Sequence, residues 1–132
     1  MNSFSILQNV KSIAVIGLSN NPDRSSYGVA KYLEQYFKIY PVNPMIDSWN
    51  GIKSYKSLTE IPDKVDLVNV FRKSEEVLHI VREAINLEIK KVWLQLGVIN
   101  NEAKDLAVSN NIEFVMDECI AVVHRLNYLS NL

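Results

Sequence analysis

Residues 12–37 read SIAVIGLSNNPDRSSYGVAKYLEQYF, and this stretch contains the pattern that decides the fold. The apolar run 13–16 is short and rich in β-branched residues, which is typical of a strand buried on both faces of a parallel sheet. Gly17 ends the run and a polar loop follows over residues 18–26. Beyond the loop, helical spacing places four apolar side chains on one face: Val29, Leu33, Tyr36 and Phe37.

A strand, a glycine turn, a polar loop and a helix form the first half of a nucleotide-binding βαβ unit. The start of such a helix offers unpaired backbone N–H groups and the positive end of its dipole to a phosphate. Ser19, Ser25 and Ser26 could add hydroxyl donors, and Arg24 could add a cation. The dinucleotide pattern G-x-G-x-x-G is incomplete, because Ser19 takes the place of its second glycine. A turn and a helix cap with no ligand would use the same residue types, so both interpretations stay open here.

The rest of the chain alternates between short apolar runs and helical patterns. Further strands are expected at residues 38–42, 65–70, 91–95 and 112–116. Helices are expected after Ser74, after a cap at Asn100 or Asn101, and over residues 120–129. Residues 3–10 could form a short leading helix, residues 45–56 an irregular excursion, and residues 57–60 a single helical turn.

This alternation predicts an α/β, Rossmann-like, three-layer αβα fold with a five-stranded parallel sheet in the order 3-2-1-4-5, as one domain over residues 1–132. Ligands of such sheets bind beyond the carboxyl ends of the strands, where the strand order reverses. The residues just past each strand are therefore the candidates for function: Gly17 to Ser19, Asn43 and Pro44, Phe71 and Arg72, Gln95 to Gly97, and Asp117 to Cys119.

The bulk composition is that of an ordinary globular protein. The 132 residues are 48% hydrophobic with a formal net charge of −1, which indicates no general attraction to nucleic acid or membrane. No secretory signal or spanning apolar run is visible, and the single cysteine fits a reducing compartment, so a cytoplasmic location is expected. No His/Cys cluster has metal-ligand spacing, and no metal site is expected.

The end of the second expected strand bears on the choice of nucleotide. An NAD site usually has a carboxylate there to accept hydrogen bonds from the ribose, whereas this chain has Asn43. A neutral amide near cations tolerates a phosphorylated ribose, and the candidate cations are Arg24, Lys53, Arg72 and Lys73. This pattern favours coenzyme A or NADP over NAD.

Five segments, in order, resemble the CoA-binding domain family, which comprises small single-domain Rossmann-type proteins similar to the N-terminal domain of the succinyl-CoA synthetase α subunit. The segments are IAVIGLSNNPDRSSYGV (13–29), YPVNP (40–44), DLVNVFR (66–72), VWLQLGV (92–98) and VMDEC (115–119). Each one alone is weak, but together they cover nearly the whole chain. One departure is Ser25, where the family commonly has proline.

The resemblance implies that the cofactor is CoA and assigns its site residue by residue. It assigns the phosphate loop to Gly17, Ser19, Arg24 and Ser26. It implies that Asn43 and Pro44 flank the adenosine, and that Phe71 and Arg72 close over the nucleotide. It also implies that Gln95 and Gly97 form the floor toward the pantetheine.

Cys119 would lie at the rim of the expected cleft, where a CoA thiol could form a mixed disulfide with it. The alternative is a small, buried, apolar side chain, which is the usual state of a free cysteine. No Ser elbow, paired carboxylates or other acid–base set stands out. Two functions remain: a non-catalytic module that binds CoA or acyl-CoA, such as a carrier or sensor, and an enzyme, either a small NAD(P)-type oxidoreductase or a component of a CoA ligase.

Overall fold

The strand that follows the N-terminal segment, β1 (Ser12–Ile16), is buried along its whole length and lies inside a parallel sheet. The structure is a computed structural model that describes residues 3–130. Five strands form the main sheet in the order β2-β1-β5-β6-β7, and every neighbouring pair is parallel. The other four strands are β2 (Lys38–Val42), β5 (Leu67–Val70), β6 (Lys91–Leu94) and β7 (Glu113–Val115).

The strand order corrects the predicted one. Counted along the chain, the five main strands lie in the order 2-1-3-4-5, so the predicted order 3-2-1-4-5 is wrong. β5 pairs with β1, with Ile13 opposite Leu67, while β2 lies at the edge. Apolar runs report burial on both faces but not which strands are neighbours. Pro41 could have indicated that β2 is an edge strand, because proline has no N–H to donate and is confined to strands with one unpaired side.

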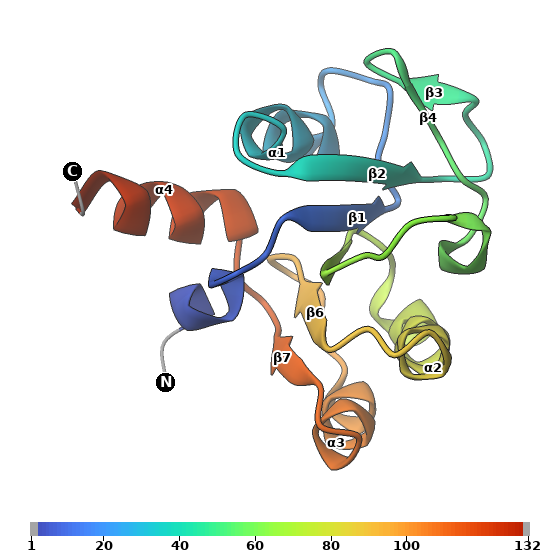
Figure 1. Cartoon of the computed structure of the whole chain (residues 1–132), viewed down its shortest axis with the longest axis vertical. Coiled ribbons are helices and arrows are strands. Elements are labelled where there is room, and N and C mark those ends of the chain that lie inside the picture. The colour runs from blue at the N-terminus through green and yellow to red at the C-terminus, as the bar shows by residue number, and fades with distance from the viewer. Residues whose placement is uncertain (1–2, 131–132) are drawn as a thin grey trace.

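Helices cover both faces of the sheet, which confirms the three-layer αβα architecture (Figure 1). α1 (Ser25–Leu33) and α4 (Ile120–Ser130) pack on one face, together with the 3-10 helix η1 (Ser3–Leu7). α2 (Val77–Asn86) and α3 (Asn101–Ser109) pack on the other face. The short 3-10 helix η3 (Ser74–Glu76) directly precedes α2 in the chain, and η2 (Leu58–Glu60) contacts α2 in space. α1 ends at Leu33, so Tyr36 and Phe37 follow the helix rather than continue it.

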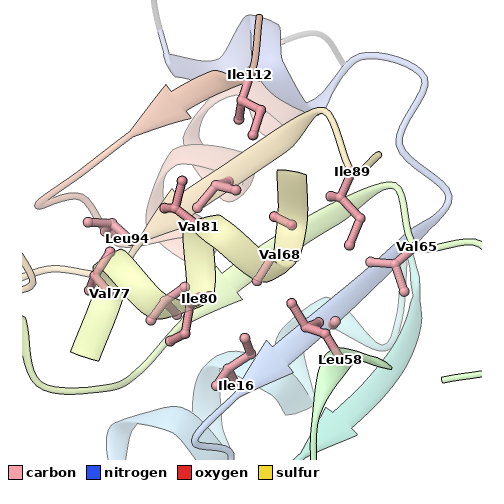
Figure 2. Packing of buried hydrophobic residues seen from close by; sticks show 14 of the residues in the cluster. Ile16, Leu58, Val65, Val68, Val77, Ile80, Val81, Ile89, Leu94 and Ile112 are labelled. Atoms are coloured by element: carbon pink, nitrogen blue, oxygen red, sulfur yellow. The ribbon is translucent and has the colours of Figure 1, made fainter. Parts of the chain in front are cut away.

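Alternate side chains along the strands pack into two separate hydrophobic clusters, one on each face of the sheet. Figure 2 shows the cluster between the sheet and α2, where Val77, Ile80 and Val81 face Val68 and Leu94. The cluster on the opposite face contains Ile13, Val15, Leu67 and Trp93 from the strands. This division follows from the period of two in a strand, and burial on both faces explains why β1 lacks polar residues after Ser12.

The expected irregular excursion over residues 45–56 contains a small hairpin. Strands β3 (Ser48–Trp49) and β4 (Ile52–Lys53) pair antiparallel around Asn50 and Gly51, whose φ angles are +49° and +78°. Two positive φ angles in succession are typical of a tight hairpin turn, and Asn-Gly is the favoured pair for it. The Trp49 side chain is fully buried and meets the ring of Tyr27 edge to face at 5.6 Å, so the hairpin packs against α1.

Candidate functional site

The carboxyl ends of β1, β2 and β5 meet above Gly17. Its N–H donates to the carbonyl of Val42 at 2.8 Å, and the N–H of Phe71 donates to the carbonyl of Ile16 at 2.8 Å. Gly17 has a φ of +84°, and a Cβ at this position would overlap the carbonyl oxygen of Phe71. Only glycine therefore allows the ends of β1 and β5 to approach this closely.

The loop after Gly17 is held by its own hydroxyl and amide groups. The N–H of Ser19 donates to Oγ of Ser26 at 3.0 Å, which connects the beginning of the loop to the first turn of α1. Oγ of Ser19 accepts from the N–H of Asn21 at 3.0 Å, and Asn20 donates to the carbonyl of Ser48 at 2.7 Å. Both serine hydroxyls act here as acceptors, so each still has an O–H to donate.

The N-terminus of α1 has no side-chain cap. Arg24 occupies the N-cap position in an extended conformation and makes no capping hydrogen bond. The N–H groups of Ser25 and Ser26 begin the helix and have no acceptor within it. With the positive end of the helix dipole, these amides make the position suitable for an anionic group.

Asn43 uses both ends of its amide within the protein. Its Nδ2 donates to the carbonyl of Leu18 at 2.9 Å, and its Oδ1 accepts from the N–H of Met45 at 2.9 Å. The side chain thus connects the end of β2 to the loop after β1. Asn43 lies beside a cleft at this edge of the sheet, and these bonds give it a structural role.

Two clefts open at this edge of the sheet. The first cleft has a volume of about 770 Å³ and contains most of the predicted site residues: Gly17, Ser19, Arg24, Ser26, Asn43, Phe71 and Arg72. Its charged side chains are the cations of Arg24, Arg72 and Lys73 and the carboxylates of Asp23 and Glu76. With three cations against two carboxylates, and with the start of α1 in its wall, the first cleft suits a phosphate.

The second cleft, of about 470 Å³, lies on the side of α2 and contains the remaining predicted neighbour of the nucleotide, Pro44. Leu58 and Ile80 contribute apolar wall, while three carboxylates also line it: Glu75, Glu76 and Glu83. Lys56 and Arg72 are its cations, so carboxylates outnumber them. This charge balance disfavours a phosphate there.

An ion pair lies where the two clefts meet. Nη2 of Arg72 donates to Oε1 of Glu76 at 2.6 Å, and both side chains are 40% exposed. Oε2 of Glu76 accepts from the N–H of Lys73 at 3.3 Å. The hydrogen bond from Arg72 is the main reason that the pKa of Glu76 is lowered, so this carboxylate is ionised at neutral pH. Sequence reasoning did not single out Glu76, although its i,i+4 spacing from Arg72 was visible.

Three predicted site residues line neither cleft. Gln95 is buried, and its Oε1 accepts from Nδ2 of Asn69 at 3.3 Å and from the N–H of Ile120 at 3.4 Å. The N–H of Gly97 donates to Oδ1 of Asp117 at 2.8 Å. Cys119 is half-buried and packs against the hydrophobic cluster beneath α1 and α4. These three residues follow the ends of β6 and β7, away from the point between β1 and β5 where the strand order reverses.

Residues 3–130 offer neither a metal-ligand cluster nor a membrane-spanning helix. No group of three or more His, Cys, Asp or Glu side chains in that range could hold a metal ion. None of the helices described there is both long and apolar enough to cross a bilayer.

The architecture and the site define a class of protein. A parallel sheet covered on both faces, with the start of a helix beside a cleft at its carboxyl edge, is the Rossmann-like arrangement. The model of the CoA binding domain matches residues 11–125, nearly the whole chain. The chain therefore belongs to the CoA-binding domain family.

Relatives fall into two kinds. A protein of Bacillus subtilis named as uncharacterized protein YneT is 42% identical over 122 residues, which are 92% of this chain and 90% of that protein. A solved structure of a hypothetical protein from Pyrococcus horikoshii is 35% identical, with a TM-score of 0.88 over 93% of this chain and 87% of that one. The ADP-forming acetate–CoA ligase of Methanocaldococcus jannaschii is 29% identical over 86% of this chain, which spans only 18% of the ligase.

Proposed function

We propose that this protein binds coenzyme A, or an acyl-CoA, as a non-catalytic module such as a carrier or sensor. One observation carries the proposal: the first cleft combines an uncapped helix start with an excess of cations, in a chain of the CoA-binding domain family. The diphosphate of CoA would lie against the N–H groups of Ser25 and Ser26, within reach of Arg24 and Arg72.

The residues that line a cleft are proposed to contact the ligand directly, whereas those outside both clefts have a more distant role. We propose direct ligand contact for Ser19, Arg24, Ser26, Phe71 and Arg72, whose side chains line the first cleft. Pro44 would contact the ligand from the second cleft. Gln95, Gly97 and Cys119 would take part only with the distal end of a long ligand, since they lie outside both clefts.

Ligand choice tests the proposal directly. Isothermal titration calorimetry with CoA, NADP and NAD should show binding of CoA and much weaker binding of the two dinucleotides. At 100 times its dissociation constant, CoA should add about 2.7 kcal/mol to the free energy of unfolding. Equal responses to CoA and NADP, or a response to neither, would contradict the proposal.

Replacement of Arg72 tests the location of the site. Arg72→Ala should raise the Kd for CoA by about tenfold or more, because it removes a charge-assisted hydrogen bond to phosphate. Arg82→Ala is the matched control, since Arg82 is exposed on α2 and lines neither cleft. Equal Kd values for both variants and the parent would place the ligand elsewhere.

A second candidate function is that of a component in an ADP-forming CoA ligase. The likeness to the acetate–CoA ligase of Methanocaldococcus jannaschii favours it, because the match lies in one part of a longer enzyme. In this case the chain would supply the CoA-binding part and a separate protein the rest. Formation of acyl-CoA by the purified chain with a carboxylate, ATP and CoA, or only after a partner subunit is added, would distinguish this candidate from a carrier or sensor.

A further inference from the structure

The two clefts meet across one side-chain contact. Among residues 3–130, Gly17, Arg72 and Glu76 are the ones that border both clefts. Gly17 has no side chain, and the Cδ of Arg72 lies 3.0 Å from the point that a Cβ on Gly17 would occupy. The Arg72–Glu76 pair therefore lies over the glycine and separates the cleft that suits a phosphate from the cleft richer in carboxylates.

Two hydrogen bonds hold the carboxylate of Glu76 in this position. Its Oε2 accepts from the N–H of Lys73 while its Oε1 accepts from Arg72, so the carboxylate stays fixed where η3 ends and α2 begins. Arg72 is less constrained, because its guanidinium has five N–H donors and lies at the end of a flexible side chain. The guanidinium is thus the partner that can move toward a phosphate in the first cleft.

We propose that Glu76 is an internal competitor for Arg72, which occupies the guanidinium until a phosphorylated ligand replaces it. The carboxylate stands in for the phosphate when the site is empty and reduces the affinity of the first cleft for phosphate groups. Glu76 is thus a positioning residue, which acts on the ligand through Arg72. This inference rests on the proposed function, since CoA is the ligand that supplies the phosphates.

Neutralisation of Glu76 separates competition from simple support. Glu76→Gln should lower the Kd for CoA by about fivefold, the size expected for one partly exposed ion pair. It should also slightly lower the melting temperature of the ligand-free protein, because the pair is lost. A residue with a merely structural role would weaken both stability and binding, whereas a competitor moves them in opposite directions.

Two comparisons make the effect specific to Arg72. In the Arg72→Gln background, the added change Glu76→Gln should leave the Kd for CoA the same within about twofold, because the guanidinium for which Glu76 competes is no longer present. Glu34→Gln is the matched control: it removes the same charge and breaks the 2.9 Å ion pair of Glu34 with Lys31, at the far end of α1. This control should not change the Kd.

The outcomes are distinguishable by calorimetry on the full chain. Tighter binding by Glu76→Gln that disappears without Arg72 supports the competitor. An unchanged or higher Kd, or the same gain with and without Arg72, overturns it while CoA binding by the parent stands. Failure of the parent to bind CoA overturns the proposed function and this inference together.

Discussion

At the scale of single residues, one glycine sets how closely two strand ends approach beneath the site. Gly17 combines a φ of +84° with direct contact between the ends of β1 and β5. The serines, arginines and asparagine around it line a cleft whose shape that contact creates. A glycine after a buried strand was visible in the sequence, but the carbonyl of Phe71 that excludes a side chain was not.

Gly17→Ala should lower the free energy of unfolding by about 2 kcal/mol or more, because alanine is strained at this φ and its methyl group overlaps Phe71. Urea denaturation measures the change. Gly28→Ala is the control, since nothing lies within 4 Å of its added Cβ, inside α1. It should stabilise the protein by about 0.5–1 kcal/mol, as expected for a helical glycine. A similar loss for both variants would show that the contact with Phe71 is unimportant.

At the scale of elements, one side-chain cap connects two neighbouring helical segments. Asn100 is the N-cap of α3: its Oδ1 accepts from the N–H of Ala103 at 2.9 Å, and its Nδ2 donates to the carbonyl of Ser74 at 2.9 Å. It therefore caps α3 and also joins it to η3, which precedes α2. The sequence left the cap open between Asn100 and Asn101, and the structure identifies Asn100.

Asn100→Ala should lower the free energy of unfolding by about 1–2 kcal/mol, because it removes the cap and the bond to η3. Thermal or urea denaturation gives the value. Asn101 is an exposed residue in the first turn of the same helix, so Asn101→Ala should be almost neutral. If Asn101→Ala were the more damaging change, the assignment of the cap would be wrong.

At the scale of the whole molecule, the strand order determines where the chain can bind a ligand. The order reverses between β1 and β5, so the connections after these two strands leave in opposite directions and open a crevice. The first cleft lies at this crevice, with Gly17 from one strand end and Phe71 from the other. The ends of β6 and β7 are farther along the sheet, which explains why Gln95 and Cys119 are outside it.

The opposite side of α1 is joined to distant parts of the chain through His124 of α4. His124 is 7% exposed, and its Nδ1 lies 2.7 Å from the hydroxyl of Tyr32 on α1. Phe4, Tyr36 and Tyr128 also have their rings close to it. Burial lowers the pKa of His124 below its ordinary value of 6.5, because the charged imidazole loses hydration.

The lowered pKa predicts how stability depends on pH. Between the folded pKa and 6.5 the unfolded chain binds the extra proton, so stability is lost as pH falls through this window. Chemical denaturation at pH values from about 7.5 down to about 5.5 should show this decline, and His124→Gln should reduce it. His79→Gln controls for loss of a histidine, since the His79 side chain is 82% exposed. The same decline in His124→Gln as in the parent would exclude His124 as its source.

The sequence by itself determined the existence of the five main strands and of the helices α1 to α4, the αβα layering, and the loop that follows β1. These features are local, because a run such as Ile13–Ile16 or the helical spacing of Val29 and Leu33 is set by short-range periodicity. Resemblance in five ordered segments also identified the CoA-binding domain family, which the family match confirms.

Only the tertiary structure decided the position of β5 beside β1, the burial of Gln95, and the pairing of Arg72 with Glu76 across the boundary of two clefts. These depend on which segments become neighbours, and an apolar run is equally buried in several strand orders. The sequence could therefore predict that the site lies at the ends of the strands. Which strand ends are neighbours depends on the strand order, in which β2 is the edge strand and β5 lies beside β1.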